Sequence, residues 1–147
     1  WSSDVCSSDL LDTDQARVLF EQFQETARHR SWQLQAVAIM RNHVHAVVGV
    51  PGNPEPETLL RDFKSYGSRA LNKRWPTPQS GTWWTESGSR RKLPNEQAIS
   101  AAVVYVREQE FPLFVWIDPL WETELGPRLD PASGGRECPL ILGTAKV

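Results

Sequence analysis

The sequence LQAVAIMRNHVHAVVGV, residues 34–50, decides the fold of this chain. Two apolar and partly β-branched runs, residues 34–40 and 44–50, flank the polar dipeptide Arg41-Asn42. Short apolar runs joined by two polar residues predict a tight β-hairpin. We expect this hairpin to form the centre of the sheet.

Two of the three histidines of the chain lie on the second strand of this hairpin. Side chains alternate along a strand, so His43 and His45 should project side by side from one face. Residues 44, 46, 48 and 50 are apolar and should anchor the other face in the core. Neutral imidazoles at positions i and i+2 can reach one cation. The alternative is that both histidines simply lie on a partly solvated strand.

Three amphipathic helices are predicted around the hairpin. The first covers residues 13–30 and follows the capping dipeptide Asp12-Thr13. The second covers about residues 57–74 and is stopped by prolines. The third starts at Asn95, a natural N-cap, and runs to about Gln109.

The other expected elements are short. Residues 83–85 are a strand candidate, residues 90–92 form a basic turn, and residues 111–117 add a strand or dock on the core. The order helix, strand, strand, helix, strand, helix predicts an α+β fold. We expect a ferredoxin-like (RRM-like) antiparallel sheet with helices on one face and the usual first strand missing.

The 147 residues, of which 39% are hydrophobic, suit one packed core. Residues 1–10 repeat Ser-Ser-Asp and are expected to be a leader outside the fold. The domain itself is assigned to residues 11–117. Residues 118–147 are rich in Pro and Gly, which predicts a mobile tail.

Membrane insertion and cysteine chemistry are not expected. The longest apolar run, residues 36–40, is far below the roughly 20 residues that cross a bilayer. Cys6 and Cys138 lie in the leader and the tail, so neither a disulfide framework nor a cysteine zinc site is predicted. A reducing cytoplasm fits this cysteine content best.

The charge is distributed unevenly along the chain. A net charge of −2 is an argument against a nucleic-acid ligand, because phosphate binding calls for a basic surface. Residues 61–92, however, carry eight basic and two acidic side chains. This local excess can be a solvated face or the electrostatic footprint of a polyanion.

The third helix places a tyrosine at the edge of its apolar stripe. Tyr105 and Gln109 are four residues apart and therefore lie one turn from each other on one side. Border positions of this kind can point into a cleft, or the hydroxyl can simply face solvent. The only other tyrosine, Tyr66, lies beside the inward face of the second helix and is interpreted as a packing residue.

The combination of His43-Val44-His45 with the later Tyr105-x-x-x-Gln109 resembles a known family, the single-tyrosine HUH transposases of the insertion-sequence-200 kind and their REP-associated relatives. The similarity includes residues 40–45, MRNHVH, where the family usually reads Met-Pro-Asn-His-x-His. It continues through residues 62–68 and the Trp83-Trp84 pair, and covers roughly residues 11–117.

The resemblance implies a metal-dependent enzyme that nicks and rejoins single-stranded DNA. His43, His45 and Gln109 would hold Mg²⁺ or Mn²⁺, and Tyr105 would be the nucleophile that forms a 5′-phosphotyrosine bond. Element ends that contain DNA hairpins would be the substrate, and a homodimer is possible within the family. The residues expected to contact DNA are Arg90, Arg91, Lys92, Trp83, Trp84, Lys64 and Arg69.

Two departures from the family pattern bear on the fold. Arg41 replaces the usual proline, which should loosen the hairpin turn. The leader stands where the family has its first strand, which predicts an exposed sheet edge and a truncated, potentially inactive copy.

Two other functions compete with the transposase interpretation. A non-catalytic nucleic-acid-binding domain can share the same topology, but it would need exposed aromatic residues on the central strands. A metal-binding regulatory domain would explain the histidines and leave the spacing of Tyr105 unexplained.

Overall fold

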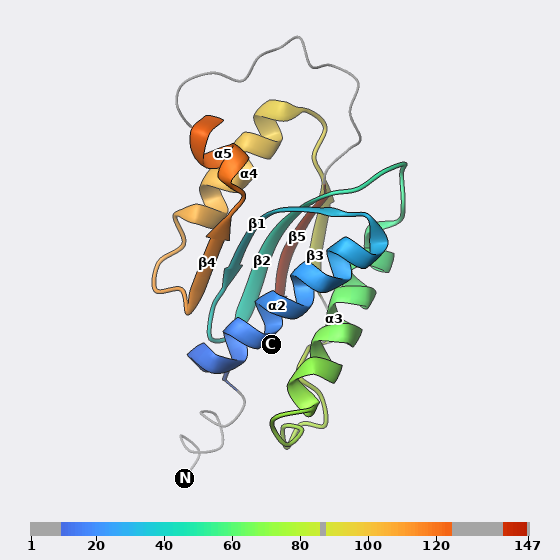
Figure 1. Cartoon of the computed structure of the whole chain (residues 1–147), viewed down its shortest axis with the longest axis vertical. Coiled ribbons are helices and arrows are strands. Elements are labelled where there is room, and N and C mark those ends of the chain that lie inside the picture. Colours follow the sequence, from blue (N-terminus) through green and yellow to red (C-terminus); the bar gives the residue numbers. More distant parts are fainter. Residues whose placement is uncertain (1–9, 86–87, 125–139, 147) are drawn as a thin grey trace.

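The computed structural model describes residues 10–85, 88–124 and 140–146, which form an antiparallel sheet with helices packed against it (Figure 1). The strand order is β3-β5-β2-β1-β4, and every neighbouring pair is antiparallel. The predicted α+β class with an antiparallel sheet is confirmed. The elements are α2 (Thr13–Arg30), β1 (Gln33–Ile39), β2 (His43–Gly49), α3 (Pro56–Asn72), β3 (Gly88–Lys92), α4 (Glu96–Arg107), β4 (Phe114–Ile117), α5 (Pro119–Glu124) and β5 (Leu140–Lys146).

The predicted hairpin is formed by β1 and β2. Ile39 is paired with Val44 at its turn, and the Met40 amide donates to the His43 carbonyl oxygen over 2.8 Å. Arg41 therefore closes a regular turn in place of proline. A bulge between Leu34 and Ala36 interrupts the pairing near the open end.

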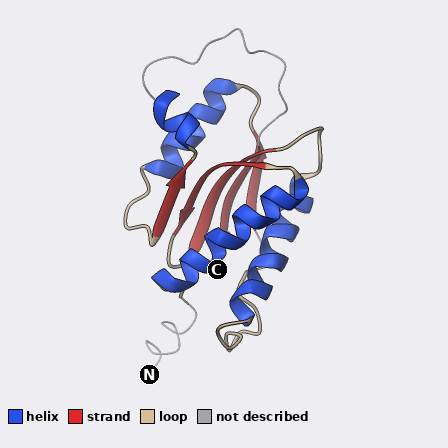
Figure 2. Ribbon diagram, in the orientation of Figure 1, coloured by secondary structure: helices blue, strands red, loops and turns tan. Residues whose placement is uncertain are grey.

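Helices cover both faces of the sheet, whereas the sequence predicted helices on one face only (Figure 2). On one side α2 and α3 pack against a set of residues that includes Val37, Ile39 and Val44. On the other side α4 packs against Ala36, Ala38 and Val47. The physical reason is that the hairpin carries apolar side chains on both faces, with Ala36, Ala38 and Val47 on the second, so a single helical layer would leave one set exposed to water.

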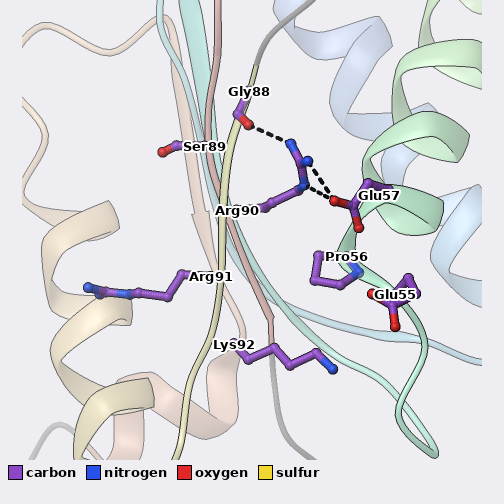
Figure 3. A pocket seen from close by; sticks show the side chains of 8 residues that line it. All are labelled: Glu55, Pro56, Glu57, Gly88, Ser89, Arg90, Arg91 and Lys92. Atoms are coloured by element: carbon purple, nitrogen blue, oxygen red, sulfur yellow. Dashed lines mark hydrogen bonds and ion pairs between the residues drawn. The ribbon is translucent and has the colours of Figure 1, made fainter.

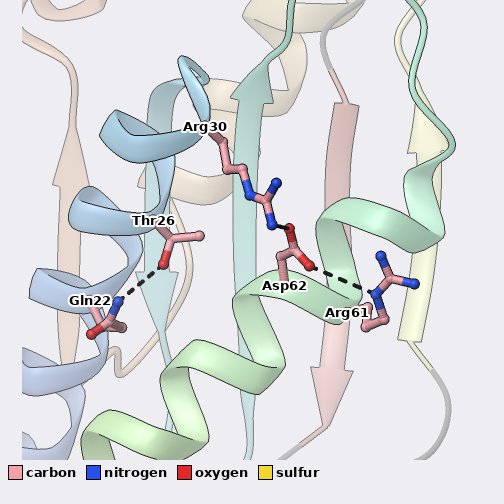
Figure 4. Close-up of polar contacts among 5 residues, drawn as sticks. All are labelled: Gln22, Thr26, Arg30, Arg61 and Asp62. Carbon is pink, nitrogen blue, oxygen red and sulfur yellow. Dashed lines mark hydrogen bonds and ion pairs between the residues drawn. The ribbon is translucent and has the colours of Figure 1, made fainter.

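Local signals set the helix boundaries. Asp12 and Gln15 form a capping box at the start of α2, with bonds of 2.8 and 3.0 Å. The Asn95 side chain accepts from the Ala98 amide at the start of α4, which confirms the predicted N-cap. Arg30, in the last turn of α2, forms a 3.0 Å ion pair with the buried Asp62 of α3, so these two helices are also joined by charge (Figure 4).

The two outer strands β3 and β5 differ from the prediction. The expected strand at residues 83–85 is absent, and the segment predicted as a basic turn lies in the edge strand β3. β5 lies between β3 and β2 and pairs with both. A charged segment such as β3 forms a strand here because β5 supplies the backbone partners, which its own side-chain pattern does not reveal.

The predictions for the two ends of the chain, a leader and a mobile tail, are tested to different extents by the structure. Residues 1–9 lie outside the described residues, so the leader and the missing first strand stay predictions. α5 and β5 lie within the segment expected to be a mobile tail. None of the helices in the described segments combines the length and the apolar character that crossing a bilayer requires.

The close contact of α2 and α3 gives a stability prediction at Gly67. A Cβ at this position would stand 2.9 Å from Leu19 Cδ2 and 3.3 Å from the Trp84 ring, both in the core. Overpacking costs about 1–3 kcal/mol, whereas alanine gains about 1 kcal/mol of helix propensity over glycine. Gly67→Ala should therefore lower the free energy of unfolding in urea by about 1 kcal/mol. Ser65→Ala, at an exposed position of the same helix, is the control and should not be destabilised; a Gly67→Ala protein as stable as the parent would contradict the packing.

Candidate active site

Strand β2 presents both histidines on the face that α4 covers. Val44 and Ala46 belong to the core under α2 and α3, and Val47 belongs to the core under α4, so the predicted alternation is confirmed. The rings of His43 and His45 lie edge to face with centroids 4.8 Å apart. His45 is 4% exposed, and His43 is half-buried. One imidazole is thus enclosed by the protein, and its neighbour lies at the surface.

Helix α4 places Tyr105 against this pair. The Tyr105 ring lies 5.4 Å from the His45 ring in an edge-to-face arrangement, and 59% of the residue remains exposed. Ile99, Val103 and Val106 fix the helix by packing into the core on this face of the sheet. α4 therefore brings Tyr105 next to the hairpin histidines, and the role of this tyrosine stays a prediction.

Burial determines the protonation state of His45. Desolvation and, to a smaller extent, the neighbouring His43 together lower the pKa of this imidazole from 6.5 to about 4. His45 is consequently neutral near pH 7, and the neutral imidazole is the form that binds metal ions.

A neighbouring amide orients the second histidine. The Nδ1 atom of His43 lies 2.6 Å from the Asn42 Oδ1 atom. An amide oxygen can only accept, so this contact places the proton on Nδ1 and leaves the Nε2 lone pair for a ligand. Asn42 was not among the predicted site residues, although the motif Asn-His-x-His contains it.

Gln109 lies just beyond the end of α4 at Arg107. Its Nε2 atom donates to the Tyr105 carbonyl oxygen over 2.9 Å, which caps the helix end and leaves the side-chain oxygen as the group that could bind a cation. The described residues contain no cluster of three or more His, Cys, Asp or Glu side chains that could hold a metal. A metal site here would need the two histidines and this amide, and its completion by Gln109 stays a prediction.

Two of the three basic residues of β3, Arg90 and Lys92, point to one side of the strand, and Arg91 points to the other (Figure 3). Arg90 donates from Nε to Glu57 of α3 over 2.8 Å, and Lys92 donates to Asn53 over 2.5 Å. A hollow of about 640 Å³ lies between β3 and the start of α3. Arg91 is directed away from Arg90 and Lys92.

The sheet register identifies the face that Arg91 occupies. Arg91 and Val47 are both paired with Ile141, and directly paired residues of antiparallel strands have their side chains on the same face. Val47 faces α4, so Arg91 lies on the histidine face. Of the three β3 residues that were predicted to contact DNA, only Arg91 lies on the same face of the sheet as Tyr105.

The other two predicted cations lie on α3, across the sheet from the histidines. Lys64 donates to the Thr85 carbonyl oxygen over 2.8 Å, and desolvation followed by the Arg90 charge lowers the pKa of its amine. Arg69 lies over the Tyr66 ring at 5.3 Å. This contact also gives Tyr66 a packing role, far from the histidine face.

The Trp83-Trp84 pair does not form a base-stacking platform, contrary to the prediction. The two residues are 6% and 7% exposed and belong to the core under α2 and α3. Trp83 donates to Asn72, and Trp84 donates to the Lys64 carbonyl and to Ser68. Both indoles pack beside α3. Burial removes the large apolar ring from water, and the single N–H donor of each ring still has a hydrogen-bond partner there.

Residues 6–109 match the family model described as "Transposase IS200 like". This match spans more than half of the chain and includes both histidines, Tyr105 and Gln109. No curated protein and no solved structure matches the chain significantly.

The depressed pKa of His45 predicts a distinct titration. The ring protons of His45 should titrate near pH 4 by NMR, against about 6.5 in the unfolded chain. Since the unfolded chain then binds the proton first, the free energy of unfolding should decrease as the pH falls from about 6.5 towards 4. His43→Gln is the matched variant and should raise the His45 pKa only slightly, because burial is the larger cause. A wild-type midpoint near 6.5 would show that water reaches the imidazole.

Proposed function

Because the chain belongs to the IS200-like transposase family, we propose that it cleaves and rejoins single-stranded DNA through a covalent bond to Tyr105. A transposase role follows from the family, and the phosphotyrosine chemistry is our proposal. The observation that carries it is the 5.4 Å contact between the rings of Tyr105 and His45, next to His43. We further propose a single-tyrosine enzyme, as in the REP-associated group, because Tyr66 lies on the opposite side of the sheet.

The donor set fits a divalent metal ion. His45 is neutral because it is buried, and His43 is oriented by Asn42, so the donor set would be two imidazole nitrogens and the Gln109 amide oxygen. Imidazole is a softer ligand than carboxylate, which favours Mn²⁺ over Mg²⁺ at this site. When bound, the ion would neutralise the charge that builds up on the scissile phosphate.

The residues of the chain would perform the transfer itself. The Tyr105 hydroxyl oxygen attacks phosphorus and forms the new P–O bond, while the bond to the 3′-oxygen breaks. The proton of the phenol ends on that oxygen as a free 3′-hydroxyl. A second 3′-hydroxyl reverses the step and joins the strands. The 59% exposure of Tyr105 suits this role, since the phosphate must approach the hydroxyl from solvent.

The competing binding-module function is disfavoured by the two helical layers. RNA-recognition modules stack bases on an open sheet face. In the described part of the chain, α2 and α3 cover one face of the central hairpin and α4 covers the other. A metal-binding regulatory domain would not explain why Tyr105 lies against the histidines.

The nucleophile assignment is tested by covalent trapping. The protein is incubated with labelled single-stranded, hairpin-forming oligonucleotides and Mn²⁺, and adducts are resolved under denaturing conditions. The parent protein should give a labelled band that Tyr105→Phe abolishes, because the phenylalanine lacks the attacking oxygen. Tyr66→Phe is the matched control and should keep the adduct. An adduct in the Tyr105→Phe protein would disprove the assignment, and no adduct in the parent would indicate an inactive copy.

Arg91 should contribute to DNA binding through a phosphate on the histidine face. Arg91→Ala is expected to weaken binding of a single-stranded oligonucleotide roughly fivefold and to reduce the salt dependence of log K by about 0.7. Arg69→Ala removes the same charge from α3 and should leave both quantities unchanged. Fluorescence anisotropy at several salt concentrations measures both; equal losses in the two variants would place the DNA elsewhere.

A further inference from the structure

Phe111 is the most exposed large apolar residue among the described parts of the chain. It is 90% exposed, against 62% for Leu120 and 59% for Tyr105. Its φ of 55° lies in the left-handed region, which bulky side chains rarely adopt. The backbone therefore adopts an unfavourable conformation to present an apolar ring to water, which packing alone does not explain.

The loop that carries Phe111 is held at both ends. Before it, the Gln109 amide caps the last turn of α4 through the Tyr105 carbonyl. After it, Pro112 fixes its own φ and restricts the preceding residue, and the Leu113 amide donates to the Ile39 carbonyl oxygen over 2.8 Å. A ring presented by a loop fixed in this way loses little entropy when a ligand stacks on it.

This loop connects the two halves of the candidate active site. It starts at the end of α4 at Arg107, two residues after Tyr105, and it returns to the sheet beside Ile39. Ile39 is paired with Val44 at the hairpin turn that precedes His43. The helix rise and the reach of an extended chain put Phe111 within about 15 Å of Tyr105, a span of a few nucleotides.

We propose that Phe111 is a stacking platform for a nucleobase of the single-stranded DNA close to the scissile phosphate, an inference that rests on the proposed function. Base stacking on aromatic rings is the usual way in which proteins hold single strands. Trp83 and Trp84 are buried, and the large aromatic rings that the described residues expose are those of Phe111 and Tyr105.

A protein partner is a poorer fit for the same ring. Stable protein interfaces need a contiguous patch of about 800 Å² on each side. Phe111 follows the exposed Glu108 and Glu110 and precedes the exposed Pro112. An isolated ring lacks the contiguous apolar patch that a protein interface needs, whereas a single flat base can stack on it.

The proposal is tested by binding of a fluorescein-labelled single-stranded oligonucleotide to the full chain with Mn²⁺. Phe111→Ala should raise Kd about tenfold, and Phe111→Trp should restore it to within about twofold of the parent. Leu120→Ala, which removes another exposed apolar side chain, should have no effect. Melting temperatures should be unchanged in all three variants, because the ring buries nothing.

A scan of single abasic sites along the oligonucleotide locates the base. In the parent protein one position should cause a loss similar to that of Phe111→Ala, and the variant should be insensitive at that position. Equal sensitivity of both proteins at every position would overturn the proposal, as would a change of oligomeric state in Phe111→Ala with unaltered DNA affinity. The outcome is independent of covalent trapping: stacking without an adduct would retain Phe111 and indicate an inactive copy.

Discussion

The fold depends on burying a two-stranded hairpin that is apolar on both faces. Val37 and Val44 face one helical layer, and Ala36, Ala38 and Val47 face the other. Neither layer alone removes both sets from water, so α4 must pack on the side opposite α2 and α3. The small side chains on the α4 side also let this helix approach the sheet closely. The position of the tyrosine is therefore a consequence of hydrophobic packing.

At His45 the packing of the core determines the protonation state of the side chain. Its imidazole occupies a position of the same alternating pattern that buries Val47, so it is enclosed almost as completely as a core residue. Burial costs the charged form far more than the neutral form, and the ring stays unprotonated near neutral pH. His43, one repeat nearer the turn, remains partly open to solvent. The pair thus has one enclosed imidazole and one that solvent reaches.

Features with local causes could be predicted from the sequence, and features with distant causes could not. Helix starts follow from Asp12 and Asn95, and the hairpin follows from two apolar runs and a polar dipeptide. The His45–Tyr105 contact was predicted because a family resemblance supplied the long-range information. β3 could not be predicted, since its partner strand β5 begins at Leu140, some 50 residues later.

The basic segment, residues 61–92, shows that the distant partners of charged side chains could not be predicted from the sequence either. The excess of basic residues at 61–92 left a solvated face and a polyanion footprint as alternatives, and strand alternation sends neighbouring cations to opposite faces of the sheet. Arg90 is neutralised by Glu57, 33 positions away, and Lys92 is held by Asn53. A count of charges cannot identify such partners, because they are set by the packing of α3 beside β3.

This distribution of positive charge bears on how single-stranded DNA would be recognised. Among the cations that the sequence singled out, Arg91 is the one on the histidine face, so phosphate attraction there is weak for a nucleic-acid enzyme. Counterion release from few contacts gives little affinity and a shallow dependence on salt. The remaining affinity would have to come from the bound metal and from base contacts, which depend little on ionic strength. A chain with a net charge of −2 can therefore bind a polyanion at one face, provided that short-range contacts carry most of the energy.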